Sequence, residues 1–203
     1  MIRQPKYKIA RRLGKGIYEK TQSQKFALRE TKGKATEIKH PRQRTDYGNQ
    51  MLEKQKARYT YGVNERQFSN YVAASVAKKG TNSIELLYHK LESRLDNVVY
   101  RIGFASTRQM ARQMVSHGHI TVNGKKVTIP SYQTMLGEKI SIREGSLKTN
   151  LFTNLAERMQ NREIPAWIKY NADAKTAEIQ GAPKMNPAEL QFDLAAVVEF
   201  YSR

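Results

Sequence analysis

The 203-residue sequence has no cysteine, which excludes disulfide bonds, a cysteine-ligated zinc site and a thiol nucleophile. Its apolar runs are only a few residues long, so we expect no segment that spans a membrane. The first residues lack the apolar stretch of a secretory signal peptide. We therefore expect a soluble, cytoplasmic protein with no membrane partner and no metal or other cofactor.

Acidic residues are also few, because 18 Asp and Glu accompany 36 Lys and Arg, which gives a formal net charge of +18. The surplus falls along the chain: residues 1–50 hold 14 basic and 4 acidic side chains, whereas residues 146–203 hold 7 of each. The hydrophobic share of 39% still allows a folded core. A basic surplus of this size predicts a polyanionic partner, and above all a nucleic acid.

The basic first 45 residues allow two interpretations. One is a solvated tail that only aids solubility, and the other is a segment that follows a phosphate backbone and becomes ordered on binding. Tyr7, Tyr18 and Phe26 lie among the cations as possible stacking groups, which favours the second interpretation. Because glycines and a proline interrupt this segment, we expect an extended or partly helical arm without a core of its own.

Beyond the arm, hydrophobic periodicity predicts an α+β fold, with a helical domain and a small antiparallel sheet. The expected helices lie at 47–60, 64–79, 82–102, 106–117, 151–159 and 190–201, and the expected strands at 120–122, 125–127, 140–142, 167–170 and 177–179. Asn64, Asn82 and Ser106 are each followed three residues later by Glu or Gln, which predicts three capping boxes. The Asn123-Gly124 pair suits a type I′ turn, because both residues tolerate a positive φ.

The segment 94–127 combines a helix, a turn, a second helix and a hairpin. Arg108 and Arg112 lie one turn apart on one face of the second helix, and apolar residues occupy its other face. Ser106 and Thr107 would add unpaired N–H groups, a typical phosphate site, at the start of that helix. Either arginine alone is most simply a solvated surface residue. Together with the turn and the hairpin lysines they predict a basic ridge.

The candidate nucleic-acid contacts follow from this ridge and from the cations that precede it. His117 and His119 are spaced poorly for a metal site, and we expect them to act as neutral hydrogen-bonding groups. The candidates in the ridge and its surroundings are Arg94, Ser106, Thr107, Arg108, Arg112, Gln113, His117, His119, Asn123, Lys125 and Lys126. The earlier candidates are Lys6, Lys8, Arg11, Arg12, Arg42, Arg44, Lys54, Lys56, Arg58 and Arg66.

Several dispersed segments carry a family resemblance: Asp46-Tyr47-Gly48, Tyr61-Gly62-Val63, Pro165-Ala166-Trp167 and the ending Glu199-Phe200-Tyr201-Ser202-Arg203. With them, the whole chain resembles the bacterial small-subunit ribosomal protein S-four family, and 94–142 resembles the RNA-binding module named after it. The resemblance implies a basic arm at 1–45, a helical domain at 46–91 that a C-terminal helix at 187–203 rejoins, and an α+β domain at 92–178 that contains the module.

The same resemblance implies a function in the ribosome. It implies a structural constituent of the small subunit that binds 16S ribosomal RNA first, nucleates subunit assembly and contributes to translational accuracy. The implied partners are small-subunit ribosomal RNA, neighbouring small-subunit proteins, especially protein five, and messenger RNA near the channel through which it enters. Many relatives also carry a four-cysteine zinc knuckle, at places where this chain has Tyr7, Ala10 and Phe26.

Two alternatives use the same module. Ser93-Arg94-Leu95-Asp96 is similar to the catalytic signature of pseudouridine synthases, but in those enzymes the signature follows the module in a separate domain. Here it begins the module and continues into an amphipathic pattern, so we expect no enzyme and interpret Asp96 as a partner for an arginine. A free-standing RNA chaperone would explain the charge but not the matching segments at 46–71 and 199–203.

Overall fold

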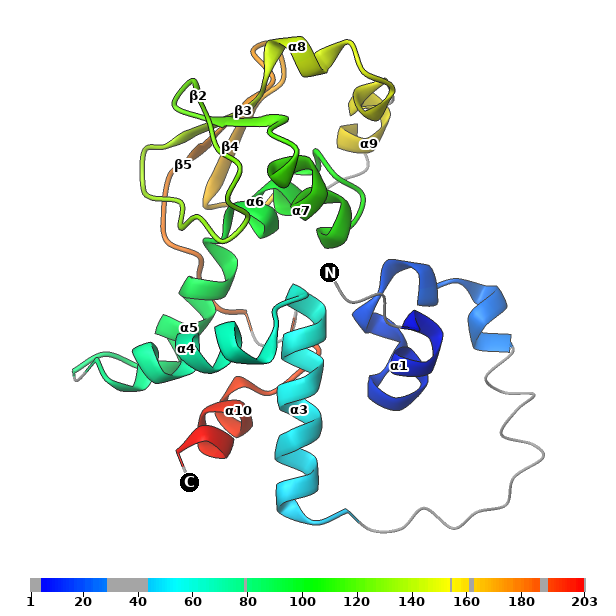
Figure 1. Ribbon diagram of the computed structural model, residues 1–203, viewed down its shortest axis with the longest axis vertical. Helices are drawn as coiled ribbons and strands as arrows, with labels where there is room; N and C mark the ends of the chain where they lie inside the picture. The colour runs from blue at the N-terminus through cyan, green and yellow to red at the C-terminus, as the bar shows by residue number, and fades with distance from the viewer. Residues whose placement is uncertain are drawn as a thin grey trace. The chain divides into compact units, whose positions relative to one another are not determined.

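The computed structural model describes residues 5–28, 44–78, 80–153, 155–160, 163–186 and 190–202. The chain divides into two compact units, Met1–Ile84 with Asn186–Arg203, and Glu85–Met185 (Figure 1). The first is helical, and the second carries helices and an antiparallel sheet, so the expected α+β class is confirmed. In the described parts of the chain, no helix combines the length and apolar character needed to cross a bilayer.

The first unit is built from capped helices. Its elements are α1 (Lys6–Leu13), the 3₁₀ turns η1 (Lys15–Ile17) and η2 (Glu19–Thr21), α3 (Asp46–Tyr61), α4 (Glu65–Val76) and α10 (Leu194–Tyr201). The Asn64 side chain accepts a hydrogen bond from the backbone N–H of Gln67, as expected of an N-cap. Gly62 ends α3 in the left-handed conformation, at φ 62°, where a side chain would be strained.

The basic N-terminal segment contains a small core that we did not predict, and this core also packs against Leu52 and Tyr59 of α3. The core residues are Ala10, Leu13, Ile17, Tyr18 and Phe26. Thr21 is fully buried, and its hydroxyl donates to the carbonyl groups of Lys15 and Tyr18. Hydrophobic periodicity does not predict this core, because its apolar residues are spread over several short turns rather than one periodic stripe.

The side chains at positions 7, 10 and 26 are held by apolar contact. The rings of Tyr7 and Phe26 stack with their centroids 5.8 Å apart, and Ala10 is 2% exposed. The described residues contain no group of three or more His, Asp or Glu that could hold a metal ion. Burial of these side chains therefore supplies the cross-link between α1 and the helical turn at 24–28.

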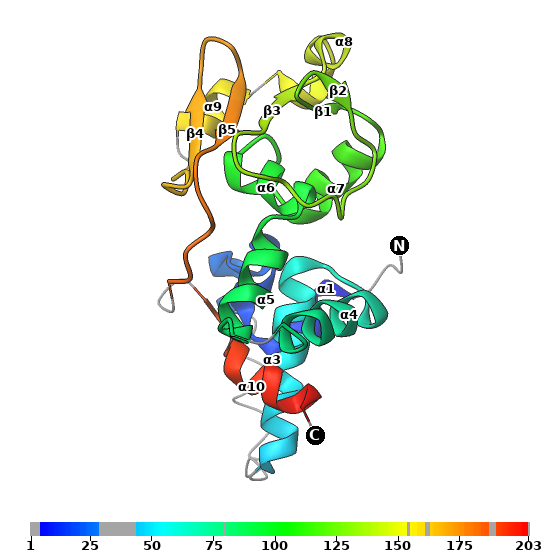
Figure 2. The same ribbon diagram turned by 90° about the vertical axis from the view of Figure 1, so that its left-hand side faces the viewer.

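Helix α10 returns to the first unit and lies beside α3 in both views (Figures 1 and 2). The Asp193 backbone N–H donates to Glu53 Oε2 at 2.9 Å, and the Tyr201 hydroxyl donates to Glu65 Oε1 at 2.7 Å. The Tyr47 and Phe200 rings pack with centroids 5.4 Å apart. The C-terminal residues thus close the helical unit, although they come more than a hundred residues after it in the sequence.

The second unit packs helices α6 and α7 against a five-stranded sheet of order β2-β1-β3-β5-β4, in which all pairs are antiparallel (Figure 2). Its core includes Val98, Ile102, Ala111, Ile120 and Ile140. The elements are α5 (Ser83–Glu92), α6 (Leu95–Ile102), α7 (Arg108–Ser116), β1 (Ile120–Val122), β2 (Lys125–Lys126), β3 (Lys139–Ile142), α8 (Glu144–Leu147), η3 (Asn150–Phe152), α9 (Leu155–Gln160), β4 (Ile168–Asn171) and β5 (Thr176–Ile179).

The prediction of a single helix at 82–102 is wrong, because the helix is interrupted between α5 and α6. Arg94 is extended there, with φ −66° and ψ 135°. A later loop takes over the backbone hydrogen bonds: the Leu95 N–H donates to the Tyr132 carbonyl, and the Thr134 N–H donates to the Ser93 carbonyl. These bonds satisfy groups that a continuous helix would have paired internally. Because the apolar stripe continues through this position, hydrophobic periodicity does not predict the interruption.

The hairpin is confirmed, since Asn123 and Gly124 adopt φ values of 50° and 78° and join β1 to β2. The strands expected near residues 140, 168 and 178 are present as β3, β4 and β5. The helix expected at 151–159 is divided into η3 and α9, and the last helix begins at Leu194 rather than at residue 190.

The N-cap of α7 is Thr107, not Ser106 as we expected. The Thr107 hydroxyl accepts a hydrogen bond from the Met110 backbone N–H at 3.1 Å, whereas the Ser106 hydroxyl lies 3.4 Å from the Met110 sulfur. Thr107→Ala should therefore lower the free energy of unfolding by about 1 kcal/mol. Ser106→Ala is the matched control and should change it by less than about 0.5 kcal/mol. Denaturant unfolding measures both, and equal losses would contradict the assignment.

The N-terminal core predicts a second, local effect. Phe26→Ala removes a ring that is 7% exposed, a change that costs about 3–5 kcal/mol in a well-packed core. Because this core is small, we expect α1 to open locally rather than the whole protein to unfold. Hydrogen exchange should speed up at α1 amides and stay unchanged in α6. Leu28→Ala, at a 64% exposed position nearby, is the control, and unchanged exchange in α1 would contradict the prediction.

Candidate nucleic-acid interface

The two arginines of α7 are both held by α6. Arg108 donates from Nε to Asn97 Oδ1 at 2.8 Å, and its guanidinium carbon lies 4.4 Å from the centre of the Tyr100 ring. Arg112 donates from Nε and Nη2 to Asp96 Oδ2, at 2.8 and 2.7 Å. Both side chains are partly exposed, so each is ordered by the protein while part of it still reaches solvent.

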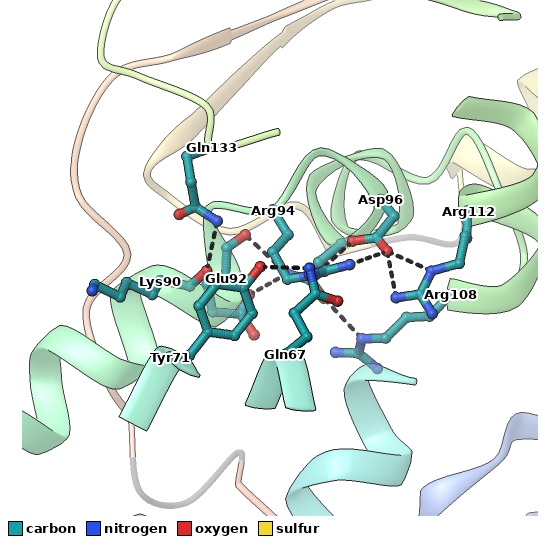
Figure 3. Close-up of polar contacts among 10 residues, drawn as sticks. Gln67, Tyr71, Lys90, Glu92, Arg94, Asp96, Arg108, Arg112 and Gln133 are labelled. Carbon is teal, nitrogen blue, oxygen red and sulfur yellow. Dashed lines mark hydrogen bonds and ion pairs between the residues drawn. The ribbon is translucent and has the colours of Figure 1, made fainter. Parts of the chain in front are cut away.

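A buried carboxylate lies at the centre of this arrangement. Asp96 is 3% exposed, and it also accepts two hydrogen bonds from Arg94, at 3.0 and 2.7 Å (Figure 3). Arg94 itself is 1% exposed, so we withdraw it from the candidate contacts: its guanidinium compensates a buried charge. The expectation that Asp96 pairs with an arginine is confirmed, although Asp96 is buried rather than on an exposed helix face.

The start of α7 is a weaker phosphate site than we expected. The Thr107 hydroxyl already accepts the N–H of Met110, one of the first amides of the helix. Ser106 and Gln113 are exposed, and Thr107 is partly so. The exposed cations of the neighbouring hairpin, rather than the helix amides, therefore provide most of the charge in this part of the unit.

The hairpin presents Lys125 and Lys126 as exposed side chains on β2. Gly118, after α7, has φ +73°, and a Cβ added there would lie 2.2 Å from Lys126 Cε. The Lys126 stem thus runs over the glycine and directs its ammonium group towards the C-terminal end of α7. Asn123 joins the hairpin turn to β3, since its Oδ1 accepts from the Lys139 N–H at 2.9 Å.

The two histidines differ in their surroundings. His117 is exposed, whereas His119 Nδ1 lies 2.9 Å from the Ser146 hydroxyl. Burial lowers the pKa of His119, and the neighbouring charges of His117 and Arg143 lower it further. This direction agrees with the expectation of a neutral hydrogen-bonding group at position 119.

In the first unit, several candidate cations maintain the fold. Lys54 is 7% exposed; its ammonium pairs with Glu65 Oε1 at 2.9 Å and lies 4.4 Å from the centre of the Phe200 ring. Arg58 donates to Glu65 Oε2 at 2.5 Å, and Lys56 pairs with Glu53 at 2.7 Å. Lys54 is therefore withdrawn as a nucleic-acid contact, because its charge is buried between α3 and α10.

The other candidate cations of this unit remain accessible. On α1, Lys8, Arg11 and Arg12 are exposed, and the Lys6 ammonium lies 5.9 Å from the centre of the Tyr18 ring. Arg44 and Arg66 are exposed as well. Arg42 lies outside the described residues. The exposed side chains at positions 8, 11 and 12 share one helix face, opposite the buried Ala10 and Leu13.

Apart from Asp96, the residues that hold the arginines in place were not predicted from the sequence. Asn97 is 2% exposed and donates to the Glu92 side chain and carbonyl; Glu92 is fully buried and accepts two hydrogen bonds from Arg101. The only available signal was the presence of polar residues within an otherwise apolar stretch, at positions 92, 96 and 97. Such residues need partners when buried, but the sequence does not say which.

Comparison with known proteins adds full-length matches. Residues 93–139 match the S4 domain, and residues 1–92 match the ribosomal protein S4/S9 N-terminal domain. Small ribosomal subunit protein uS4 of Roseiflexus castenholzii is 45% identical over 201 residues, which cover 98% of this chain and 97% of the relative. Proteins of the same name from Chloroflexus aurantiacus and Limosilactobacillus reuteri are 41% and 38% identical, again over 98% of this chain and 97% of each relative.

The contacts of Glu65 predict how acid affects the first unit. Burial alone would raise the pKa of Glu65, but hydrogen bonds from Tyr201, Lys54 and Arg58, with the charge of Lys54, lower it overall. Its contribution to stability is thus present above the pKa of the unfolded chain and is lost as the pH falls through the folded value. Glu65→Gln should lower stability at pH 7 and weaken its dependence on pH below about 4.5.

Urea unfolding between pH 3 and pH 7 measures this dependence. Glu163→Gln, which removes an exposed carboxylate in the loop before β4, should leave the pH profile close to that of the unmodified protein. A Glu65→Gln profile parallel to the unmodified one would show that these hydrogen bonds do not stabilise the fold.

Proposed function

The chain belongs to the small ribosomal subunit protein uS4 family, and on that premise we propose that it is a structural constituent of the small ribosomal subunit that binds 16S ribosomal RNA directly. The observation that carries the proposal is the segment 106–126, in which α7 carries two partly exposed arginines and β2 carries two exposed lysines. We place the protein in the ribosome, as a binding protein rather than an enzyme.

The binding uses shape and charge rather than base reading. Duplex RNA has a deep, narrow major groove that side chains read poorly, so a protein contacts mainly its phosphates and sugars. Arg108, Arg112, Lys125 and Lys126 are the phosphate contacts of the second unit. His117, Gln113 and Ser106 are exposed along the same segment and serve as hydrogen-bonding groups to sugar or phosphate.

The first unit contributes a second set of contacts. Lys8, Arg11 and Arg12 present one basic face of α1, and Arg44 and Arg66 extend the set. These side chains neutralise phosphates where RNA helices converge, and the release of counterions drives much of such binding. Lys6, Lys56 and Arg58 are only partly exposed, so they are secondary contacts.

The resemblance to the bacterial family supports finer proposals. The protein nucleates small-subunit assembly by binding ribosomal RNA early, and it contributes to translational accuracy through small-subunit protein five. Its exposed cations also lie near messenger RNA where the messenger enters the subunit. Chemical footprinting on naked 16S ribosomal RNA tests the first proposal, since protection without other proteins is expected. Protection that needs other proteins would exclude primary binding.

Stable incorporation separates a structural constituent from a free RNA chaperone. We expect stoichiometric retention of the protein on small subunits after a high-salt wash, measured by co-sedimentation. Release in the wash would instead favour the chaperone, which acts transiently.

Salt dependence tests the segment 106–126 directly. Replacing Arg108 and Lys125 by Ala should weaken binding to the ribosomal RNA and flatten the plot of log K against log salt by about 0.7–0.9 per lost contact. Lys169→Ala is the control, because Lys169 is exposed on β4, at the opposite edge of the sheet from β2. If the double variant keeps the slope of the unmodified protein, these side chains do not contact phosphate.

A further inference from the structure

We propose that Asp96 and Asn97 are positioning residues: they fix the guanidinium groups of Arg112 and Arg108 in the orientation in which these bind RNA. The proposal rests on the RNA-binding function proposed above and adds to it residues that touch no RNA. Both are at least 97% buried, so they act through the arginines alone.

The first step is the pattern of contacts between two helices. Adjacent residues of α6 hold arginines that are one turn apart on α7. Asn97 holds Arg108, and Asp96 holds Arg112 (Figure 3). Each contact uses Nε, the nitrogen nearest the side-chain stem, at 2.8 Å. A bond to Nε fixes the plane of the guanidinium group, and in Arg112 a second bond, from Nη2 to Asp96 Oδ2 at 2.7 Å, fixes it further.

The second step is that Asp96 and Asn97 are themselves held in place. Asn97 Nδ2 donates to Glu92 Oε2 at 2.9 Å and to the Glu92 carbonyl at 3.0 Å, so its Oδ1 must face the other way, towards Arg108. Asp96 is fixed on one side by the buried Arg94. The Tyr100 ring lies against the Arg108 guanidinium and adds a stacking contact. Asp96 and Asn97 therefore each have a single orientation before RNA binds.

The third step concerns charge. If the purpose of this cluster were affinity through charge alone, carboxylates beside RNA-binding arginines would be unfavourable. Asn97 is neutral, so its hydrogen bond orders Arg108 without cancelling its charge. Asp96 is shared by Arg94 and Arg112, so these three groups together keep one positive charge. The cluster thus orders the cations and still leaves a positive surface.

Ordering a long side chain in advance strengthens binding because less conformational entropy is lost in the complex. For Arg108 this predicts that Asn97→Ala weakens binding to the ribosomal RNA about two- to tenfold, the effect of one side chain immobilised on binding. The salt slope should stay unchanged, because Asn97→Ala removes no charge. Arg108→Ala should instead flatten the slope.

A double-mutant cycle tests the proposal. We would measure the Kd for 16S ribosomal RNA of the unmodified protein, Asn97→Ala, Arg108→Ala and the double variant, at several salt concentrations. If Asn97 acts through Arg108, Asn97→Ala weakens binding only while Arg108 is present, and the double variant binds like Arg108→Ala. If Asn97 only supports the fold, it weakens binding equally in both backgrounds, which overturns the proposal.

The controls separate the possible failures. Asn171→Ala removes an asparagine that also accepts two backbone hydrogen bonds in this unit, and it should leave the Kd unchanged. Thermal unfolding of each variant identifies any loss of structure. Failure of the unmodified protein to bind would refute the proposed function, whereas tight binding that is insensitive to Asn97 would refute only the positioning role.

Discussion

The buried carboxylate of Asp96 is the interaction on which the second unit depends. It accepts hydrogen bonds from Arg94, at the break between α5 and α6, and from Arg112 on α7, so one residue joins three segments of the chain. A charge that is 3% exposed is costly unless it is paired, which makes the break at Arg94 and the placement of α7 interdependent. The turn between α5 and α6 and the helix that carries Arg108 and Arg112 are therefore fixed by the same contact.

Much of the fold could be predicted from local sequence, because caps, glycine ends and periodicity act within a few residues. The N-cap at Asn64 and the Asn123-Gly124 turn are examples. The break at Arg94 could not be predicted, since the groups that replace its helical hydrogen bonds come from a loop about forty residues later. In the site, the exposed cations could be chosen by charge, but the partners of Arg108 and Arg112 depend on how α6 packs on α7.

Charge alone does not separate structural cations from binding ones. Lys54 and Arg94 look like other basic residues in the sequence, yet both are buried and paired with carboxylates. Each lies where a distant element closes the fold: α10 covers Lys54, and the loop at 130–134 meets the chain beside Arg94. A cation at such a junction is withdrawn from solvent, so a surplus of basic residues sets an upper limit on the number of phosphate contacts.

The N-terminal segment folds although its cations are dense. Repulsion among 14 basic side chains in the first 50 residues opposes compaction. Burial of Ala10, Leu13 and Phe26 offsets this repulsion and places Lys8, Arg11 and Arg12 on the outer face of α1. A helix that is already folded loses less entropy on binding than an extended arm would. The arm and the α6–α7 pair thus share one feature, because in both of them buried groups order the exposed cations that we propose as RNA contacts.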